Sequence, residues 1–189
     1  EGNADSFLHV IRAEIDLADD ADSHSAEVYA LGGKNLTALR ERGCLVQEES
    51  PCLYLYRQIM DGHAQTGLVG AYSVDEYDAG TIVKHEHTRP DKEADRTAHV
   101  TALSAQTGPV FLTYRPSKAL SGLVTTLQAG EPFFDFTSPD GVQHTVWRVT
   151  EPQPFVDALT DVNPLYIADG HHRSASAANV RRQRREAGQ

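Results

Sequence analysis

The sequence predicts an α+β protein in which helices flank a mixed β-sheet. Segments with the apolar spacing of a helix are interspersed with short apolar, β-branched runs typical of strands. Two pairs of these runs are joined by the turn sequences Asp61-Gly62 and Pro139-Asp140-Gly141, which indicate antiparallel hairpins. Antiparallel hairpins argue against a doubly wound sheet built of parallel strands alone.

The first helix and the first hairpin follow an N-terminal stretch that shows no clear element. Residues 25–43 have apolar residues recurring on one side, a serine that can cap the start and a glycine that can end the helix. Residues 52–60 alternate between apolar and polar, and residues 66–74 are apolar and β-branched. The Asp61-Gly62 turn between these two runs completes the pattern of a hairpin.

The rest of the chain continues to intersperse helices and strands. Residues 80–87 resemble a further strand, and residues 90–103 begin with proline and acidic residues, as helices often do. The same criteria predict a short buried strand over Val110–Tyr114, a helix over Leu120–Gln128, a hairpin of Phe133–Phe136 and Val142–Val149, helical turns over Phe155–Leu159, a strand over Leu165–Ala168 and a helix over His171–Ala187.

Composition restricts the class of protein. A chain of 189 residues is long enough to bury a core, and we expect one domain over residues 1–189. The 17 basic residues against 27 acidic ones give a net charge of −10, which argues against a nucleic-acid partner. No apolar run is long enough to cross a membrane, so no membrane partner is expected. Cys44 and Cys52, without a secretion signal, indicate free thiols and a cytoplasmic protein. The oligomeric state stays open.

The most informative segment is the predicted strand that runs through Asp169-Gly170-His171-His172-Arg173-Ser174 into a helix. Glycine in this turn lets a ligand approach the backbone, and Asp169 is placed to cap the helix. The free N–H groups and the dipole of the helix start favour an anion, and the Arg173 guanidinium suits phosphate. His171 and His172 can donate hydrogen bonds or carry protons near neutral pH. The segment therefore predicts a phosphate site, most plausibly for a nucleotide.

A second polar segment, residues 84–96, leaves two chemical interpretations open. If residues 80–87 form a strand, His85 and His87 lie on one face and Glu86 on the other. Two histidines on one strand face are typical ligands of a metal such as Zn²⁺. Arg89 and Lys92, at the start of the next helix, are candidates for binding a phosphate or the carboxylate of a substrate. The alternative without a functional role is that these side chains are solvated surface residues.

Four segments resemble a known family, the bacterial and archaeal domain of unknown function 1015. The Asp-Gly-His-His-Arg turn also resembles the phosphate-binding box of the ParB/sulfiredoxin superfamily. Family members are roughly twice as long as this chain, which would then be their central part. The segments that carry the resemblance are Ser6–Val10, Lys84–Glu93, Ala105–Val110 and Tyr166–Arg173.

The superfamily implies three chemistries, and this sequence fits them unequally. Sulfiredoxin uses a cysteine in its box, where this chain has His171, so a sulfur nucleophile is missing. ParB proteins bind and hydrolyse CTP and carry a separate DNA-binding domain, which does not follow here. Free-serine kinases are the most similar, because they combine an Asp-Gly-His turn with a glutamate on a preceding strand. The resemblance implies that role for Glu86, as the general base or as a metal partner.

The resulting expectation is a nucleotide-dependent phosphotransferase that acts on a small hydroxyl substrate such as a free amino acid. The cofactor would be ADP or ATP with Mg²⁺, and the partners would be that nucleotide and the small substrate. Two alternatives stay open, a regulatory module that binds a nucleotide without turnover and a metal-dependent hydrolase that uses His85 and His87. The residues assigned to phosphate binding are Gly170, His171, His172, Arg173 and Ser174; those assigned to catalysis are Glu86, Asp169 and His171; those assigned to the substrate are Arg89 and Lys92.

Overall fold

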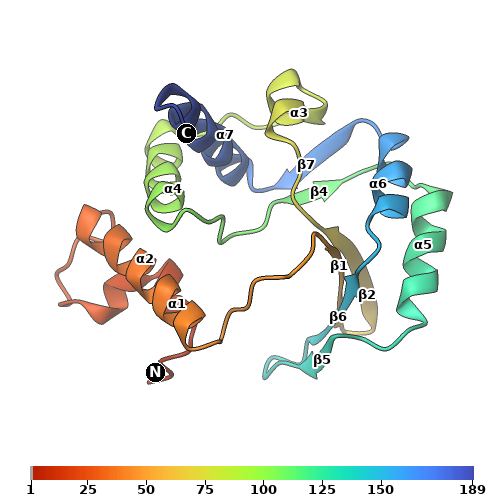
Figure 1. Cartoon of the computed structure of the whole chain (residues 1–189), viewed down its shortest axis with the longest axis horizontal. Coiled ribbons are helices and arrows are strands. Elements are labelled where there is room, and N and C mark those ends of the chain that lie inside the picture. The colour runs from red at the N-terminus through yellow and green to blue at the C-terminus, as the bar shows by residue number, and fades with distance from the viewer. Residues whose placement is uncertain (1) are drawn as a thin grey trace. The chain divides into compact units, whose positions relative to one another are not determined.

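A computed structural model of the chain describes residues 2–189 and groups them into two compact units, which are considered separately (Figure 1). Unit 1 consists of three chain segments: the chain up to Gln47, Val74–Thr113 and Leu165–Gln189. Unit 2 consists of Glu48–Ser73 and Tyr114–Pro164. The grouping describes local compactness, and the expected single domain over residues 1–189 stays a prediction.

Unit 1 combines helices with a small mixed sheet. Its strands follow the order β3-β7-β4, with β7 parallel to β3 and antiparallel to β4. Ile167, in the central strand, is fully buried. Helix α4 packs beside α7 (Figure 1). The elements are α1 (Leu8–Ile11), a 3-10 turn η1 (Ala13–Asp16), α2 (Ala26–Glu41), α3 (Val74–Ala79), β3 (Ile82–Val83), α4 (Pro90–Leu103), β4 (Phe111–Thr113), β7 (Leu165–Asp169) and α7 (His171–Glu186).

Local signals explain where the helices of unit 1 begin and end. The Ser25 hydroxyl accepts a hydrogen bond from the Val28 N–H at 3.3 Å, so Ser25 caps α2 as predicted. Gly43, with φ +74°, follows the last turn of that helix and lets the chain reverse. Pro90 occupies the first position of α4, which spans the predicted residues 90–103. These two helices confirm the sequence-based prediction.

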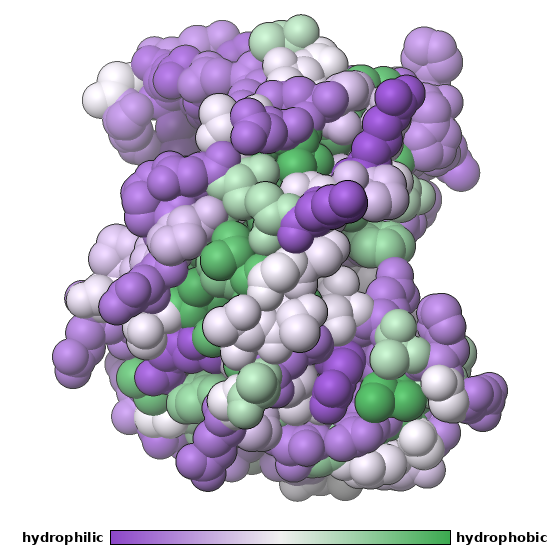
Figure 2. Space-filling view, turned by 90° about the vertical axis from the view of Figure 1, so that its right-hand side faces the viewer, coloured by the Kyte–Doolittle hydropathy of each residue, from purple (hydrophilic) through white to green (hydrophobic). Residues whose placement is uncertain are grey.

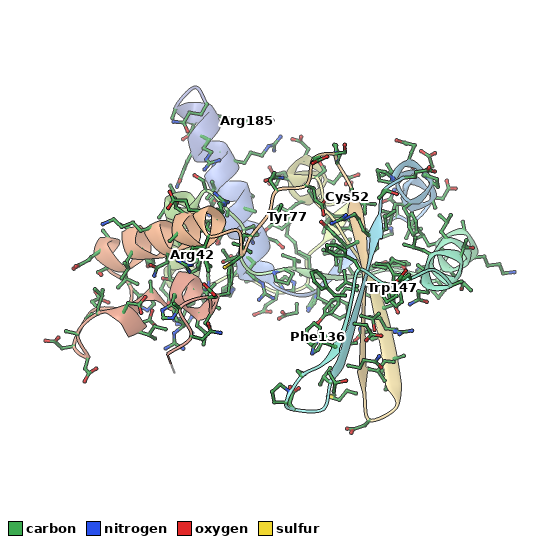
Figure 3. All side chains as sticks on the ribbon, turned by 60° about the horizontal axis from the view of Figure 1, so that its bottom comes forward. Arg42, Cys52, Tyr77, Phe136, Trp147 and Arg185 are labelled. Carbon is green, nitrogen blue, oxygen red and sulfur yellow. The ribbon has the colours of Figure 1, made fainter. Side chains whose placement is uncertain are left out.

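Unit 2 is built on an antiparallel sheet with the strand order β2-β1-β6-β5. Both predicted hairpins are present, and the register places Leu55 opposite Trp147. Trp147 is buried, and its indole N–H donates to the Gly130 carbonyl at 3.1 Å. The strand register puts the side chains of Trp147 and Phe136 on different faces of the sheet (Figure 3). The elements are β1 (Leu53–Met60), β2 (His63–Val69), α5 (Lys118–Gln128), β5 (Phe134–Thr137), β6 (Gln143–Val149) and α6 (Gln153–Thr160).

Hydrophobic residues remain at the surface of both units. Phe134 and Phe136 of β5 are each 55% exposed. Figure 2 views the side on which α5 lies in Figure 1, and hydrophobic residues there form several separate patches among hydrophilic ones. Within residues 2–189, every helix is too short or too polar to traverse a lipid bilayer.

Several predicted boundaries are wrong. The strand expected over residues 80–87 contains only Ile82–Val83, because the polar residues that follow make no ladder. The strand expected over 66–74 runs instead from His63 to Val69, and the chain then enters α3. Phe111 in β4 is exposed, although this strand was expected to be buried. The strands also divide into two sheets rather than one, while the α+β class itself is confirmed.

Candidate functional site

A pocket of about 410 Å³ in unit 1 opens at the point where β7 passes into α7. Its walls come from the turn and first residues of α7 and from one side of α4. The segment between β3 and α4, the segment before β4 and the end of α1 complete them. Residues distant in sequence therefore meet around one cavity. The lining residues are Ile11, Glu86, Lys92, Arg96, His99, Val100, Gln106, Thr107, Gly108, Asp169, Gly170, His171, His172, Arg173 and Ser176.

The turn into α7 has the backbone conformation that its glycine predicts. Gly170 is the N-cap residue and has φ +98°, a left-handed value that favours glycine. The first regular hydrogen bond of the helix runs from the Ser174 N–H to the Gly170 carbonyl. The N–H groups of the first turn precede that bond, so they are available to an anion in the pocket. Asp169 does not cap the helix as expected, since it is the last residue of β7 and its carboxylate accepts from Arg173.

Arg173 lies across this turn in a space created by two glycines. A Cβ atom added to Gly170 would stand 2.9 Å from Nε and Nη2 of Arg173, and one added to Gly108 would stand 3.0 Å from its Cδ. Nη2 donates to the carboxylate of Asp169. Nε is buried and has no hydrogen-bond partner within the described residues. A buried donor without a partner is costly, so this guanidinium retains capacity to bind an oxygen ligand.

His171 links the start of α7 to the segment that carries Glu86. The ring is buried, with 5% of the residue exposed, and its Nε2 accepts from the His85 N–H at 3.4 Å. Because Nε2 accepts, the proton of the neutral ring sits on Nδ1, which is 3.6 Å from Oε2 of Glu86. Burial, followed by the neighbouring His85, lowers the pKa of His171. We infer a neutral His171 whose N–H faces the Glu86 carboxylate at neutral pH.

His172 makes a parallel link one step further along the chain. Its Nε2 accepts from the Arg89 N–H at 3.4 Å, and its carbonyl accepts from the Ser176 hydroxyl at 2.7 Å. The two histidines therefore fasten both ends of the 85–89 segment to α7. These contacts position the 85–89 segment, whereas the sequence analysis assigned His171 and His172 to phosphate binding.

Glu93 joins α4 to α7 next to this link. Its carboxylate accepts from the Thr88 hydroxyl at 2.6 Å and from the side-chain amide of Asn179. The Thr88 hydrogen bond and then the Asn179 hydrogen bond lower the pKa of Glu93, against the opposing effect of burial. These bonds favour the charged carboxylate in the folded state.

The Glu93 contacts predict a pH-dependent loss of stability in Glu93→Gln. The lowered pKa means that the wild-type carboxylate stabilises the fold above the unfolded-state pKa, and that this contribution is lost as the pH falls through the folded-state value. We expect the free energy of unfolding of Glu93→Gln to be about 1.5–3 kcal/mol lower than that of the wild-type protein at pH 7, the range for a hydrogen bond to a charged group. The loss should shrink steadily below pH 4.5.

Urea unfolding followed by circular dichroism at pH 7, 5 and 3.5 measures this difference. Glu41→Gln, an exposed glutamate at the end of α2, is the matched control and should show no such trend. A loss that is the same at all three pH values would contradict a role for the Glu93 charge.

Most of the residues predicted from sequence meet at the pocket. Glu86 and Lys92 line it together with Asp169 through Arg173. Arg89 does not line it, because its side chain pairs with Asp91 at 2.7 Å. Ser174 does not line it either, since its hydroxyl turns back to the Gly170 carbonyl at 3.2 Å. The assignments of Arg89 to the substrate and of Ser174 to the phosphates stay predictions, and neither residue lines the pocket.

The strand geometry behind the alternative metal site is wrong. β3 ends at Val83, so His85 and His87 do not share a strand face. The His85 ring stands edge-on to His171, with the ring centroids 4.5 Å apart. In residues 2–189 no group of three or more potential histidine, cysteine or carboxylate ligands is assembled.

Eight pocket residues were not assigned to the site from the sequence: Ile11, Arg96, His99, Val100, Gln106, Thr107, Gly108 and Ser176. Arg96 and His99 lie on α4, and helical spacing from Lys92 would have placed Arg96 on the same side. Gln106, Thr107 and Gly108 precede β4, and the Gln106 amide donates to the Arg173 carbonyl at 3.4 Å. The segment Ala105–Val110, which contains these three residues, is one of the four that carry the family resemblance. That resemblance was the signal that could have identified them.

The pocket differs in charge from the chain as a whole. Three permanent cations, Lys92, Arg96 and Arg173, line it against two carboxylates, those of Glu86 and Asp169. The whole chain carries −10. A local excess of positive charge in an acidic protein favours an anionic ligand at this place.

Comparison with known proteins places the chain in a family. No curated protein and no solved structure matches it. The likeness to the ParB/sulfiredoxin superfamily, and to its free-serine kinases, stays a prediction. A family described as "Protein of unknown function (DUF1015)" matches residues 1–189, which include every segment around the pocket. The chain therefore belongs to the DUF1015 family.

Proposed function

We propose that unit 1 binds the phosphates of a nucleotide in this pocket and transfers a phosphoryl group to a small hydroxyl substrate. One observation carries the proposal: the pocket joins the free N–H groups of the α7 start to three cationic side chains in an acidic protein. Helix starts and guanidinium groups are the usual phosphate ligands of proteins. The earlier resemblance to serine kinases makes free serine the first acceptor to try.

The residues at the turn fit a phosphate group. Gly170 and Gly108 leave the backbone bare on either side of Arg173, and the buried Nε of Arg173 still has a hydrogen to donate. The cavity of about 410 Å³ falls within the roughly 300–1,000 Å³ typical of small-molecule sites. Phosphoryl transfer depends mainly on positioning and charge neutralisation, and this pocket offers both.

Glu86 is the candidate general base. Its side chain is 60% exposed at the pocket, and the Nδ1–H of His171 faces one of its oxygens at 3.6 Å. As a carboxylate exposed at the pocket, Glu86 can accept the proton of a substrate hydroxyl. Mg²⁺ bound with a nucleotide would neutralise phosphate charge, and Oδ1 of Asp169, the oxygen that does not accept from Arg173, would help to hold it. Lys92 and Arg173 would bind the charged oxygens of the phosphates.

Arg173→Ala tests the phosphate-binding part of the proposal. We expect ATP, ADP or CTP, each with Mg²⁺, to bind the wild-type protein, and the variant to weaken that binding by more than tenfold. The variant lacks the charged guanidinium donor, and a hydrogen bond from a charged donor contributes about 1.5–3 kcal/mol to the binding free energy. Calorimetric titration measures the affinities.

Arg185→Gln is the control, because it removes one positive charge from the far end of α7 (Figure 3). It should leave nucleotide affinity nearly unchanged. Absence of binding by all three nucleotides, or equal affinity in Arg173→Ala, would sink the nucleotide proposal.

A further inference from the structure

We infer that the pocket contains a second anion-binding subsite, centred on Arg96, and that this subsite takes a carboxylate of the small substrate. The inference rests on the proposed function, because it assumes that phosphate occupies the α7 turn. It narrows the substrate from any small hydroxyl compound to one that carries its own negative charge.

The subsite lies on one side of α4. Lys92, Arg96 and Val100 are spaced four residues apart, and all three line the pocket. Four residues correspond to about 6 Å along a helix, so Arg96 lies one turn beyond Lys92. Lys92 is close to the start of α4, where Arg89 contacts His172, and Arg96 lies further from that contact. The cationic side of α4 thus extends away from the phosphate turn.

The Arg96 guanidinium is available to a ligand. Its one ion contact within the described residues is with Asp95, with Nε 4.0 Å from Oδ2, which is weak. The Asp95 carboxylate is already engaged, since Oδ1 accepts from the Tyr29 hydroxyl at 2.6 Å and contacts His24 at 2.8 Å. Lys92 also has no ion-pair partner for its ammonium in the part of the chain that the structure describes.

Arg173 and Arg96 belong to different walls of the pocket. Arg173 is fixed at the turn by Asp169 and by the space over Gly170. Arg96 comes from α4, which also lines the pocket with Lys92, His99 and Val100. A ligand that contacts both arginines therefore carries two anionic groups with a short spacer between them.

The chemistry of the Arg96 wall favours a carboxylate over a second phosphate. No helix start and no glycine-lined backbone accompanies Arg96, whereas both features surround the α7 turn. The planar guanidinium of Arg96 matches the two oxygens of a planar carboxylate. A hydroxy acid, including a hydroxyl-bearing amino acid, has this charge and this size.

Two probes separate the subsites: O-phosphoserine, which carries phosphate and carboxylate, and O-phosphoethanolamine, which lacks only the carboxylate. We expect the wild-type protein to bind O-phosphoserine at least tenfold more tightly in calorimetric titration. Arg96→Gln should reduce this preference to about onefold to twofold without changing the affinity for O-phosphoethanolamine. Arg96→Lys should keep part of the preference, because it retains the charge but not the planar fork. Arg173→Ala should weaken both probes alike, and Arg185→Gln should change neither.

Each other outcome has a definite meaning. Equal binding of the two probes by the wild-type protein overturns the carboxylate subsite and leaves the phosphate site standing. If Arg96→Gln weakens both probes equally, Arg96 is a phosphate ligand and the inference is overturned. If neither probe binds and no nucleotide binds, the proposed function itself fails. Circular dichroism of each variant distinguishes lost binding from lost folding.

Discussion

Glu86→Gln should reduce phosphoryl transfer by at least a hundredfold while nucleotide affinity stays within tenfold of the wild-type value. General-base catalysis contributes about 10²–10⁴ in rate, and an amide cannot accept the proton of the hydroxyl. The side chain is 60% exposed and its nearest ionic neighbour is His171, so the substitution disturbs little packing. Glutamine also keeps an oxygen that can face the His171 N–H.

Phosphorus NMR of product formation, with ATP and free serine as the first substrates, gives the rate, and calorimetry gives the affinity. Asp91→Asn removes an equal charge from an exposed residue of α4 outside the pocket, and should leave both quantities unchanged. A fully active Glu86→Gln protein would remove Glu86 from the mechanism. Nucleotide binding without turnover by the wild-type protein would favour the regulatory module over the phosphotransferase.

Gly170→Ala should weaken phosphate binding as much as the loss of Arg173 does. Any side chain at this position faces two costs. The backbone has φ +98°, where an L-residue is strained by about 1–2 kcal/mol. The new Cβ would also stand 2.9 Å from Nε and Nη2 of Arg173, so the guanidinium must leave the turn. Binding should fall by more than tenfold, and stability should fall by the backbone cost.

Gly80→Ala separates these two costs, because Gly80 in the same unit has φ +80° and open space around its Cα. It should lose similar stability in urea unfolding and keep nucleotide affinity. Equal affinities of Gly170→Ala and the wild-type protein would show that Arg173 does not need its place over the turn.

Local signals in the sequence predict the helices well. The features that these signals miss depend on contacts between residues distant in the sequence. The Ser25 cap and Gly43 define α2 from neighbouring residues alone. In contrast, the short β3 could not be predicted, because the sequence does not show that Lys84 to His87 have no partner strand to bond. The division of the strands into two sheets also depends on pairing between distant segments, which single-sequence patterns do not specify.

In the candidate site, too, some residues are recognisable from the local sequence and others only from the tertiary structure. Gly170 and Arg173 are recognisable from the turn itself, since glycine and arginine have direct physical roles there. Arg96 was missed because its participation depends on which side of α4 faces the pocket. His171 and His172 were assigned to phosphate, whereas their Nε2 atoms accept backbone hydrogen bonds from the 85–89 segment. Only the tertiary structure shows that one ring nitrogen of each histidine, Nε2, already accepts a backbone hydrogen bond.

The discontinuity of unit 1 affects how the pocket is made during protein synthesis. Among the described strands, β3 and β4 each pair only with β7, which comes after both in the chain. The sheet of unit 2 is complete at Val149, before Leu165 is translated. Closing the chain over the intervening residues costs entropy that only the arrival of β7 repays. The nascent protein therefore completes both hairpins of unit 2 before the turn at Gly170 can form.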